Sequence, residues 1–163
     1  MECYLIAKIL AEDAAWKFAK EHNIDMISIN PAGVIGPMLQ PTMNITTFSI
    51  VFNLINGSET YRNASLGLVH VKDVAEAHIR ALEIPSANGR YVLSESVMHN
   101  AVIVEILREL YPNLKLPNKC EDNLPLTPSY KISKEKAKTL GIDYIPSKVA
   151  LKETVECLKE KFM

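Results

Sequence analysis

Glycine is scarce in this sequence, with six glycines among 163 residues. None of them belongs to a G-x-G-x-x-G turn or to a G-x-x-x-x-G-K-[ST] loop. Both motifs surround the phosphates of a bound nucleotide with backbone N–H groups. The 163 residues therefore lack the usual phosphate-binding turn of a nucleotide-binding domain.

Cysteine is also rare, and the sequence has neither an excess of charge nor a long apolar run. Cys3, Cys120 and Cys157 lie far apart without C-x-x-C spacing, which argues against a zinc site and favours a reducing compartment. The 18 basic and 19 acidic residues give a net charge of −1, so nucleic acid and anionic membranes are not expected partners. No apolar run reaches the roughly 18 residues of a membrane span, and the stretch after Met1 is broken at Lys8 and forms no signal peptide. We expect a cytoplasmic protein without a metal site.

The hydrophobic share of 48% and the charged share of 23% are typical of a folded globular protein. Periodicity predicts helices over 4–21, 45–56, 73–83, 100–111, 133–141 and 147–162, and short strands over 24–29, 66–71, 90–93 and 130–132. We expect loops over 30–41 and over the proline-rich residues 112–129, and a helix cap at Asp73. Alternating strands and helices predict an α/β fold, and the pattern is that of the back portion of a larger α/β domain.

Tyr4 and Lys8 have the spacing that places two side chains on one face of a helix. A phenol has a pKa of about 10, and a neighbouring ammonium group lowers it. Such a phenol can give its proton to a carbonyl oxygen while hydride reaches the carbon, and the ammonium can hold ribose hydroxyls. Three other Tyr/Lys pairs share the spacing but are interrupted by proline or precede a helix cap: Tyr111/Lys115, Tyr130/Lys134 and Tyr144/Lys148. The structural alternative is a partly buried tyrosine beside an extended lysine.

The segment Asn30–Pro37 follows the first predicted strand. Ligands of open α/β sheets bind at this carboxyl end of the strands. Pro31 fixes the backbone there, and Gly33 permits the close approach of a flat ring. The alternative is an ordinary proline/glycine turn.

Four motifs occur in one order: Tyr4-x-x-x-Lys8, Asn30-Pro31-x-x-Val34-x-Gly36-Pro37, His70-Val71-Lys72-Asp73-Val74-Ala75-x-Ala77-His78 and Gly89-Arg90-Tyr91. This order resembles the extended short-chain dehydrogenase/reductases. The match is closest to the plant branch of cinnamoyl-CoA reductases, dihydroflavonol reductases and phenylacetaldehyde-reductase-like enzymes, and the segments 40–42 and 151–155 strengthen it. The resemblance implies the C-terminal part of a Rossmann-like NAD(P)-binding fold plus a small substrate-binding lobe. Residues 1–163 would then be the C-terminal half of one epimerase/dehydratase-type reductase domain, without its N-terminal dinucleotide-binding half.

By this resemblance Tyr4 is the catalytic acid/base, and Lys8 stabilises its phenolate and holds the nicotinamide ribose. The residues that would contact the cofactor, NADP, are Tyr4, Lys8, Pro31, Ala32, Gly33, Val34 and Thr46. Arg90 and Tyr91 would lie near the substrate, and a strand with a satisfied arginine is the alternative. His70–Asp73 is expected to be architectural.

The resemblance implies NADP-dependent reduction of phenylpropanoid-like aldehydes, ketones or CoA thioesters. Leu5 stands where true cinnamoyl-CoA reductases usually have glycine, which favours the broader reductase-like cluster. One alternative is a non-catalytic remnant or interaction domain, because the glycine turn and the catalytic serine are not in these residues. A nucleotide-sugar epimerase or dehydratase is a second alternative, against which Gln40-Pro41-Thr42 argues. We expect the isolated chain to be inactive and to self-associate through an exposed sheet edge at 26–29.

Overall fold

The computed structural model describes residues 2–40 and 46–162, and gives the backbone alone at Glu2 and at 46–48. The helices are α1 (Glu2–Glu21), α2 (Thr46–Ile55), α3 (Val71–Glu83), α4 (Asn100–Leu110), α5 (Glu135–Lys138) and α6 (Ser147–Phe162). The strands are β1 (Ile27–Pro31), β2 (Gly33–Ile35), β3 (Thr60–Tyr61), β4 (Ser65–His70), β5 (Gly89–Leu93), β6 (Ser96–His99) and β7 (Lys119–Cys120).

One run of chain, β1 followed by β2, connects two groups of strands. β1 pairs in parallel with β5, from Ile27 opposite Gly89 to Pro31 opposite Leu93. The N–H of Ala32 then donates to the Leu93 carbonyl at 2.8 Å. β2 leaves β5 and pairs in parallel with β4, which pairs antiparallel with β6. The short strands β3 and β7 pair separately.

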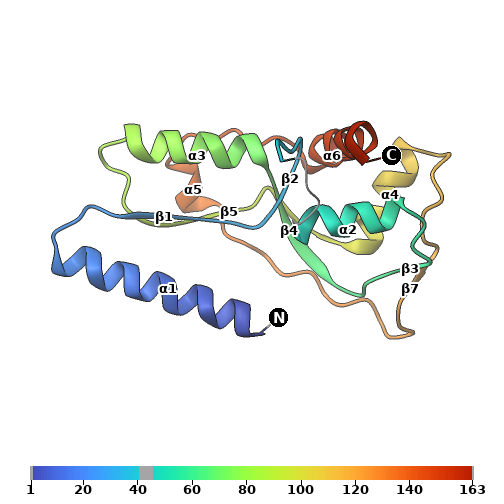
Figure 1. Ribbon diagram of the computed structural model, residues 1–163, viewed down its shortest axis with the longest axis horizontal. Helices are drawn as coiled ribbons and strands as arrows, with labels where there is room; N and C mark the ends of the chain where they lie inside the picture. Colours follow the sequence, from blue (N-terminus) through green and yellow to red (C-terminus); the bar gives the residue numbers. More distant parts are fainter. Residues whose placement is uncertain (1, 41–45, 163) are drawn as a thin grey trace.

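Helices lie on both sides of the β1–β5 pair. Figure 1 shows α1 on one side of these strands, with α3 and α5 on the other. One buried cluster joins α3, α5 and β5, and a second joins α2, α4 and α6 to β2 and β4. The second cluster includes Ile35, Leu68, Leu107, Leu151 and Leu158, none of which exposes surface to solvent. The apolar side chains of α6 are therefore part of the core.

The α/β class and most of the expected elements are confirmed, and the errors concern short strands and loops. Residues 33–35 were expected in a loop but form β2 by pairing with β4. Residues 130–132 form no strand, because the Tyr130 hydroxyl accepts a hydrogen bond from the Gly67 N–H (3.1 Å) in place of a backbone ladder. The strands β3, β6 and β7 were not expected. Their pairing partners are remote in sequence, so local patterns do not reveal them.

The expected cap of α3 was also wrong, because His70 caps this helix. His70 Nδ1 accepts a hydrogen bond from the Lys72 N–H at 3.0 Å, so Nε2 donates to Glu153 at 3.1 Å. The Asp73 carboxylate instead accepts from the Ile145 N–H at 3.1 Å, and burial raises its pKa. The buried side chains of His70 and Asp73 thus join α3 to α6 and to the loop before α6, which is an architectural role.

Candidate active site

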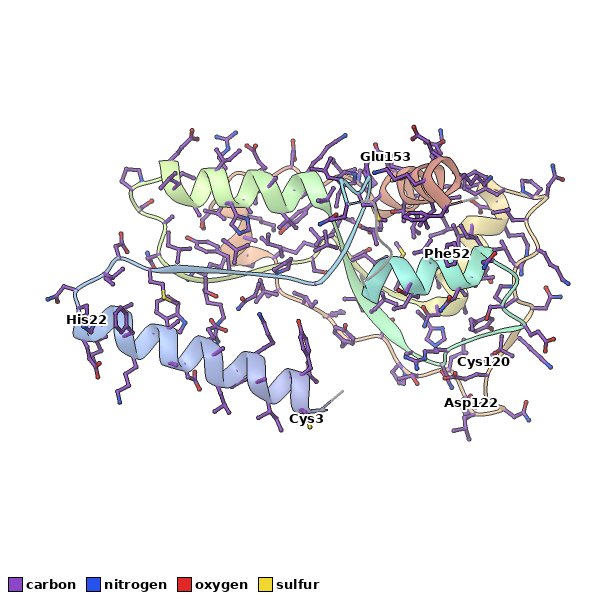
Figure 2. All side chains as sticks on the ribbon, viewed as in Figure 1. Cys3, His22, Phe52, Cys120, Asp122 and Glu153 are labelled. Atoms are coloured by element: carbon purple, nitrogen blue, oxygen red, sulfur yellow. The ribbon has the colours of Figure 1, made fainter. Side chains whose placement is uncertain are left out.

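The helix α1 carries the first two candidate residues. Tyr4 and Lys8 lie one turn apart near its start, and 66% of the Tyr4 surface is exposed. Figure 1 shows α1 running antiparallel to β1, so the start of the helix lies at the same end as the carboxyl end of the strand. In Figure 2 Cys3 marks this end of α1, and His22 follows the other end. The fold therefore brings Tyr4 to the end of the sheet where α/β proteins bind ligands.

A cleft of about 1010 Å³ separates α1 from β1. Tyr4 and Lys8 line one wall, and Met26–Pro31 lines the other. The Asn30 side chain faces this space, since its Nδ2 donates to Glu12 Oε2 at 3.4 Å and its Oδ1 accepts from the Ser28 hydroxyl at 3.1 Å. The cleft thus unites the Tyr/Lys pair with the Asn-Pro segment.

Three other candidate cofactor contacts, Ala32, Gly33 and Val34, are not among the residues that line this cleft. Ala32, Gly33 and Val34 are half-buried and follow Pro31 in the sheet. Gly33 lies opposite Leu68 of β4, and Val34 packs against the core between α3 and β5. Thr46 is the first residue of α2, and its side chain lies outside the described residues.

The two candidate substrate residues have other partners. Arg90 Nε donates to Glu12 Oε1 at 2.7 Å, which agrees with the alternative of a satisfied arginine. Tyr91 is 2% exposed, and its hydroxyl accepts from the Asn88 N–H at 3.2 Å. The Lys136 ammonium lies 4.7 Å from the centroid of the same ring. A substrate role for Arg90 and Tyr91 stays a prediction; in the structure Arg90 is paired with Glu12, and Tyr91 is part of the core.

Glu12 is a residue of this site that the sequence patterns did not single out. Its Oε1 accepts from Arg90 and from the Trp16 indole N–H, the latter at 3.1 Å. The hydrogen bonds from Arg90 and Trp16 hold the pKa of the Glu12 carboxyl at about 2. This carboxylate thus connects α1 to β5, and through Asn30 to β1.

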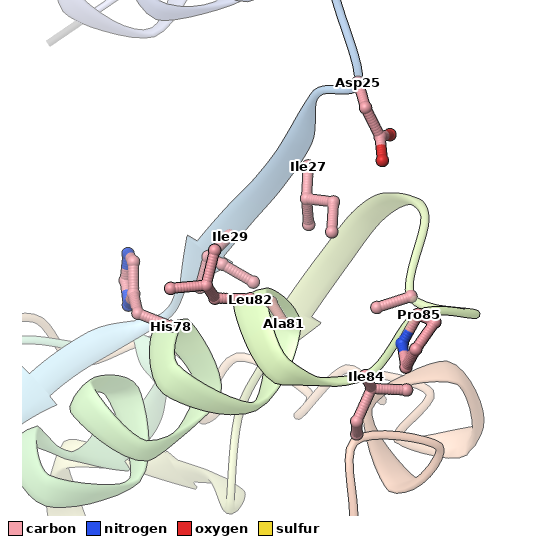
Figure 3. Close-up of a pocket in the computed structure, with 9 residues that line it drawn as sticks. Asp25, Ile27, Ile29, His78, Ala81, Leu82, Ile84 and Pro85 are labelled. Atoms are coloured by element: carbon pink, nitrogen blue, oxygen red, sulfur yellow. The ribbon is translucent and has the colours of Figure 1, made fainter.

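A second pocket, of about 340 Å³, lies between β1 and α3 on the other face of the strand (Figure 3). Its lining is mainly apolar, and His78 Nδ1 donates to the Val74 carbonyl of its own helix at 2.7 Å. Leu82 lies at its rim and is 89% exposed. The Tyr/Lys cleft, by contrast, holds a potential proton donor beside a cation.

Across 2–40 and 46–162, no three His, Cys, Asp or Glu side chains gather as metal ligands would. Within the same ranges, every helix is too short or too polar to cross a membrane.

The comparison with protein families decides the classification. The model of the NAD dependent epimerase/dehydratase family matches residues 1–94, more than half of the chain. The chain belongs to this family. The match includes α1, the Asn-Pro segment and the His70–Asp73 segment, and so it covers the candidate site.

Members of the family from plants resemble the whole chain. Cinnamoyl-CoA reductase CAD2 of Medicago truncatula is 60% identical over 158 residues, which are 97% of this chain and 48% of the relative. Cinnamoyl-CoA reductase 1 of Arabidopsis thaliana is 43% identical over 159 residues, 97% of this chain and 46% of the relative. The expected resemblance to plant cinnamoyl-CoA reductases is confirmed. The chain spans about half the length of these curated relatives.

Solved structures support the fold of this family member. Vestitone reductase from alfalfa (Medicago sativa) has a TM-score of 0.81 at 22% identity, over 97% of this chain and 52% of that one. The yeast methylglyoxal/isovaleraldehyde reductase Gre2, complexed with NADPH, has a TM-score of 0.78 at 26% identity, over 93% of this chain and 49% of that one. The expected Rossmann-like α/β architecture is thus confirmed.

Proposed function

We propose that residues 1–163 form the C-terminal half of an NADP-dependent carbonyl reductase domain, the half that contributes the proton donor. The observation that carries the proposal is the single cleft that places Tyr4 and Lys8 opposite Asn30 and Pro31. The volume of the cleft, about 1010 Å³, is at the upper end of the range for small-molecule sites. The plant relatives named cinnamoyl-CoA reductases support the same reaction class.

The side chains in the cleft suit the nicotinamide end of the cofactor. Lys8 is an exposed cation with three donors for ribose hydroxyls. Pro31 presents a ring without an N–H group at the carboxyl end of β1, and we propose that Pro31, Ala32, Gly33 and Val34 flank the nicotinamide, with Thr46 also in reach. NADPH, when bound, supplies the hydride.

Tyr4 is the proposed acid. Its hydroxyl gives a proton to the carbonyl oxygen of the substrate as the carbonyl carbon is reduced, so the product is an alcohol. Lys8 stabilises the phenolate that remains, because an ammonium one helical turn away favours the charged form of a phenol. A proton from solvent then restores Tyr4.

The proposed substrates are phenylpropanoid-like aldehydes, ketones or CoA thioesters. The names of the plant relatives favour this class. The three free cysteines are compatible with a reducing compartment, and we propose the cytoplasm.

A fusion protein tests the reductase proposal. The part of the Medicago truncatula relative that precedes its match is joined ahead of residue 1, and oxidation of NADPH is followed with cinnamaldehyde-like and phenylacetaldehyde-like carbonyls and a cinnamoyl thioester. We expect turnover with at least one of these classes, and more with NADPH than with NADH. A folded fusion that binds NADPH but reduces none of them would contradict the proposal. The intact relative is the positive control.

Self-association of the isolated chain is a separate proposal. Among the described residues β1 has a strand partner on one side only, and Leu10 on α1 and Leu82 on α3 are 62% and 89% exposed. Unpaired edges and uncovered apolar surface recruit other chains. We expect light scattering to show a mass that rises with concentration, and the double variant Leu10→Lys/Leu82→Lys to reduce this rise. A monomeric mass over a wide concentration range would contradict the proposal.

A further inference from the structure

Only a few of the described side chains of α1 are covered by the rest of the chain. Of the described side chains of this helix, all are exposed except those of Glu12, Trp16 and Ala19. These three recur at positions i, i+4 and i+7, which form one line along a helix. Tyr4 and Lys8 continue this line toward the start of the helix but are themselves exposed, so other residues must hold them in place over the strand.

Glu12 makes the connections along this line that reach across to the sheet. It receives hydrogen bonds from Arg90 (2.7 Å) and Asn30 (3.4 Å), and Trp16 of its own helix donates to the same carboxylate at 3.1 Å. Arg90 lies opposite Ser28 in the β1–β5 ladder, so one carboxylate contacts two neighbouring strands at once. Trp16 is half-buried and Ala19 is buried, and among the hydrogen bonds of the described residues neither side chain bonds to the sheet.

Because Glu12 lies some distance along the helix from the candidate catalytic pair, a small tilt of the helix at Glu12 displaces Tyr4 and Lys8. At 1.5 Å per residue, Lys8 lies about 6 Å and Tyr4 about 12 Å from Glu12 along the axis. A tilt of about 10° at Glu12 would therefore displace Tyr4 by about 2 Å. Displacements near 1 Å at a reacting group can cost about 10²-fold in rate.

We propose that Glu12 is a positioning residue, which fixes the Tyr4–Lys8 end of α1 over the carboxyl end of β1 through Arg90 and Asn30. The inference rests on the proposed function only for the roles of Tyr4 and Lys8. The position of the helix can be measured in the 163-residue chain itself, without any turnover.

Cys3 provides the reporter for this measurement. It is exposed on α1 next to Tyr4, whereas Cys157 is buried. A Cys120→Ser background with Leu82→Cys gives a second exposed thiol, on α3 across the sheet. Nitroxide labels at Cys3 and at position 82 then report the distance between the two helices by double electron–electron resonance, with the labelled chain diluted in excess unlabelled chain.

We expect a narrow distance distribution in this parent chain. Glu12→Gln keeps the size of the side chain but removes its charge, and we expect the distribution to shift or broaden by about 2 Å or more, as the lever arm implies. Arg90→Gln breaks the same contact from the strand and is expected to have the same effect. The double variant is expected to add little, because both changes remove one interaction.

Asp13→Asn is the matched control, since it removes one carboxylate from an exposed position of the same helix. An unchanged distribution in Glu12→Gln would overturn the proposal, whatever the melting temperature does, and so would an equal broadening in Asp13→Asn. If Glu12→Gln does not fold, Arg90→Gln alone gives the answer. Failure of the fusion protein to reduce carbonyls would count against the proposed function and would leave the result for Glu12 unaffected.

Discussion

Tyr4→Phe is expected to lower the turnover of the fusion protein by about 10²-fold or more, the usual loss when a general acid is removed. Phenylalanine keeps the ring and loses only the hydroxyl, so the carbonyl oxygen would develop its charge without a proton donor. The ring still lines the cleft with Lys8 beside it, and the affinity for NADPH should stay close to that of the parent. The kcat of carbonyl reduction and the Kd for NADPH, measured on the same preparations, separate the two effects.

Two further variants define what this result means. Lys8→Met should weaken NADPH binding and lower turnover together, because the ammonium is proposed to serve both the ribose and the phenolate. Tyr111→Phe is the control, since Tyr111 shares the spacing to a lysine but directly follows α4, and its hydroxyl donates to the Lys152 carbonyl at 3.2 Å. Near-normal turnover in Tyr4→Phe would remove Tyr4 from the mechanism. A loss of thermal stability alone in Lys8→Met would make Lys8 structural.

The isolated chain of 163 residues is expected to bind NADPH no more tightly than about 1 mM, which corresponds to about −4 kcal/mol. Dinucleotide affinity in this architecture depends on a pyrophosphate held by a glycine turn at a helix N-terminus, and the sequence contains no such turn. The cleft offers a wall for the nicotinamide and one lysine for its ribose. A few hydrogen bonds contribute about 0.5–1.5 kcal/mol each, whereas association itself costs at least about 4 kcal/mol. The net free energy of binding is therefore small.

Isothermal titration of the chain with NADPH tests this expectation directly. The fusion protein is the positive control, because it adds the preceding half of a relative and with it a candidate phosphate site. Micromolar binding by the isolated chain would mean that the principal cofactor site lies within these residues and does not depend on an N-terminal half. Measurable carbonyl reduction by the isolated chain would contradict its expected inactivity.

The parts of the fold that could be predicted from sequence are those with a long local signal. The helices α1 and α6 are long enough for a 3.6-residue pattern to stand out, and β4 and β5 have turn residues or a helix start beside them. The strands β2, β3 and β7 have three residues or fewer and exist because remote residues pair with them. A run of two or three residues is too short to show alternation, so only the tertiary structure identifies it.

In the candidate site, too, residues in local motifs could be predicted from the sequence, and a residue with a remote partner could not. Tyr4, Lys8 and the Asn-Pro segment were predicted because they belong to ordered motifs, and the structure brings them to one cleft. Glu12 was missed because its main partner, Arg90, is 78 residues away. A weak signal was present, since Glu12 and Trp16 follow Lys8 at successive intervals of four. Ala11 and Ala15, which directly precede Glu12 and Trp16, are exposed.

Pro31 limits how far a further strand can pair along the free edge of β1 among the described residues. Successive N–H groups of a strand point to opposite sides, and the N–H of Ala32 points to β5, so the nitrogen of Pro31 faces the side without a strand partner among the described residues. A strand added on that side finds donors at Ile27 and Ile29 but none at Pro31. The added ladder must therefore stop before the carboxyl end of β1. Whichever chain supplies that strand, the mouth of the cleft beside Tyr4 stays clear of backbone pairing and open to a small molecule.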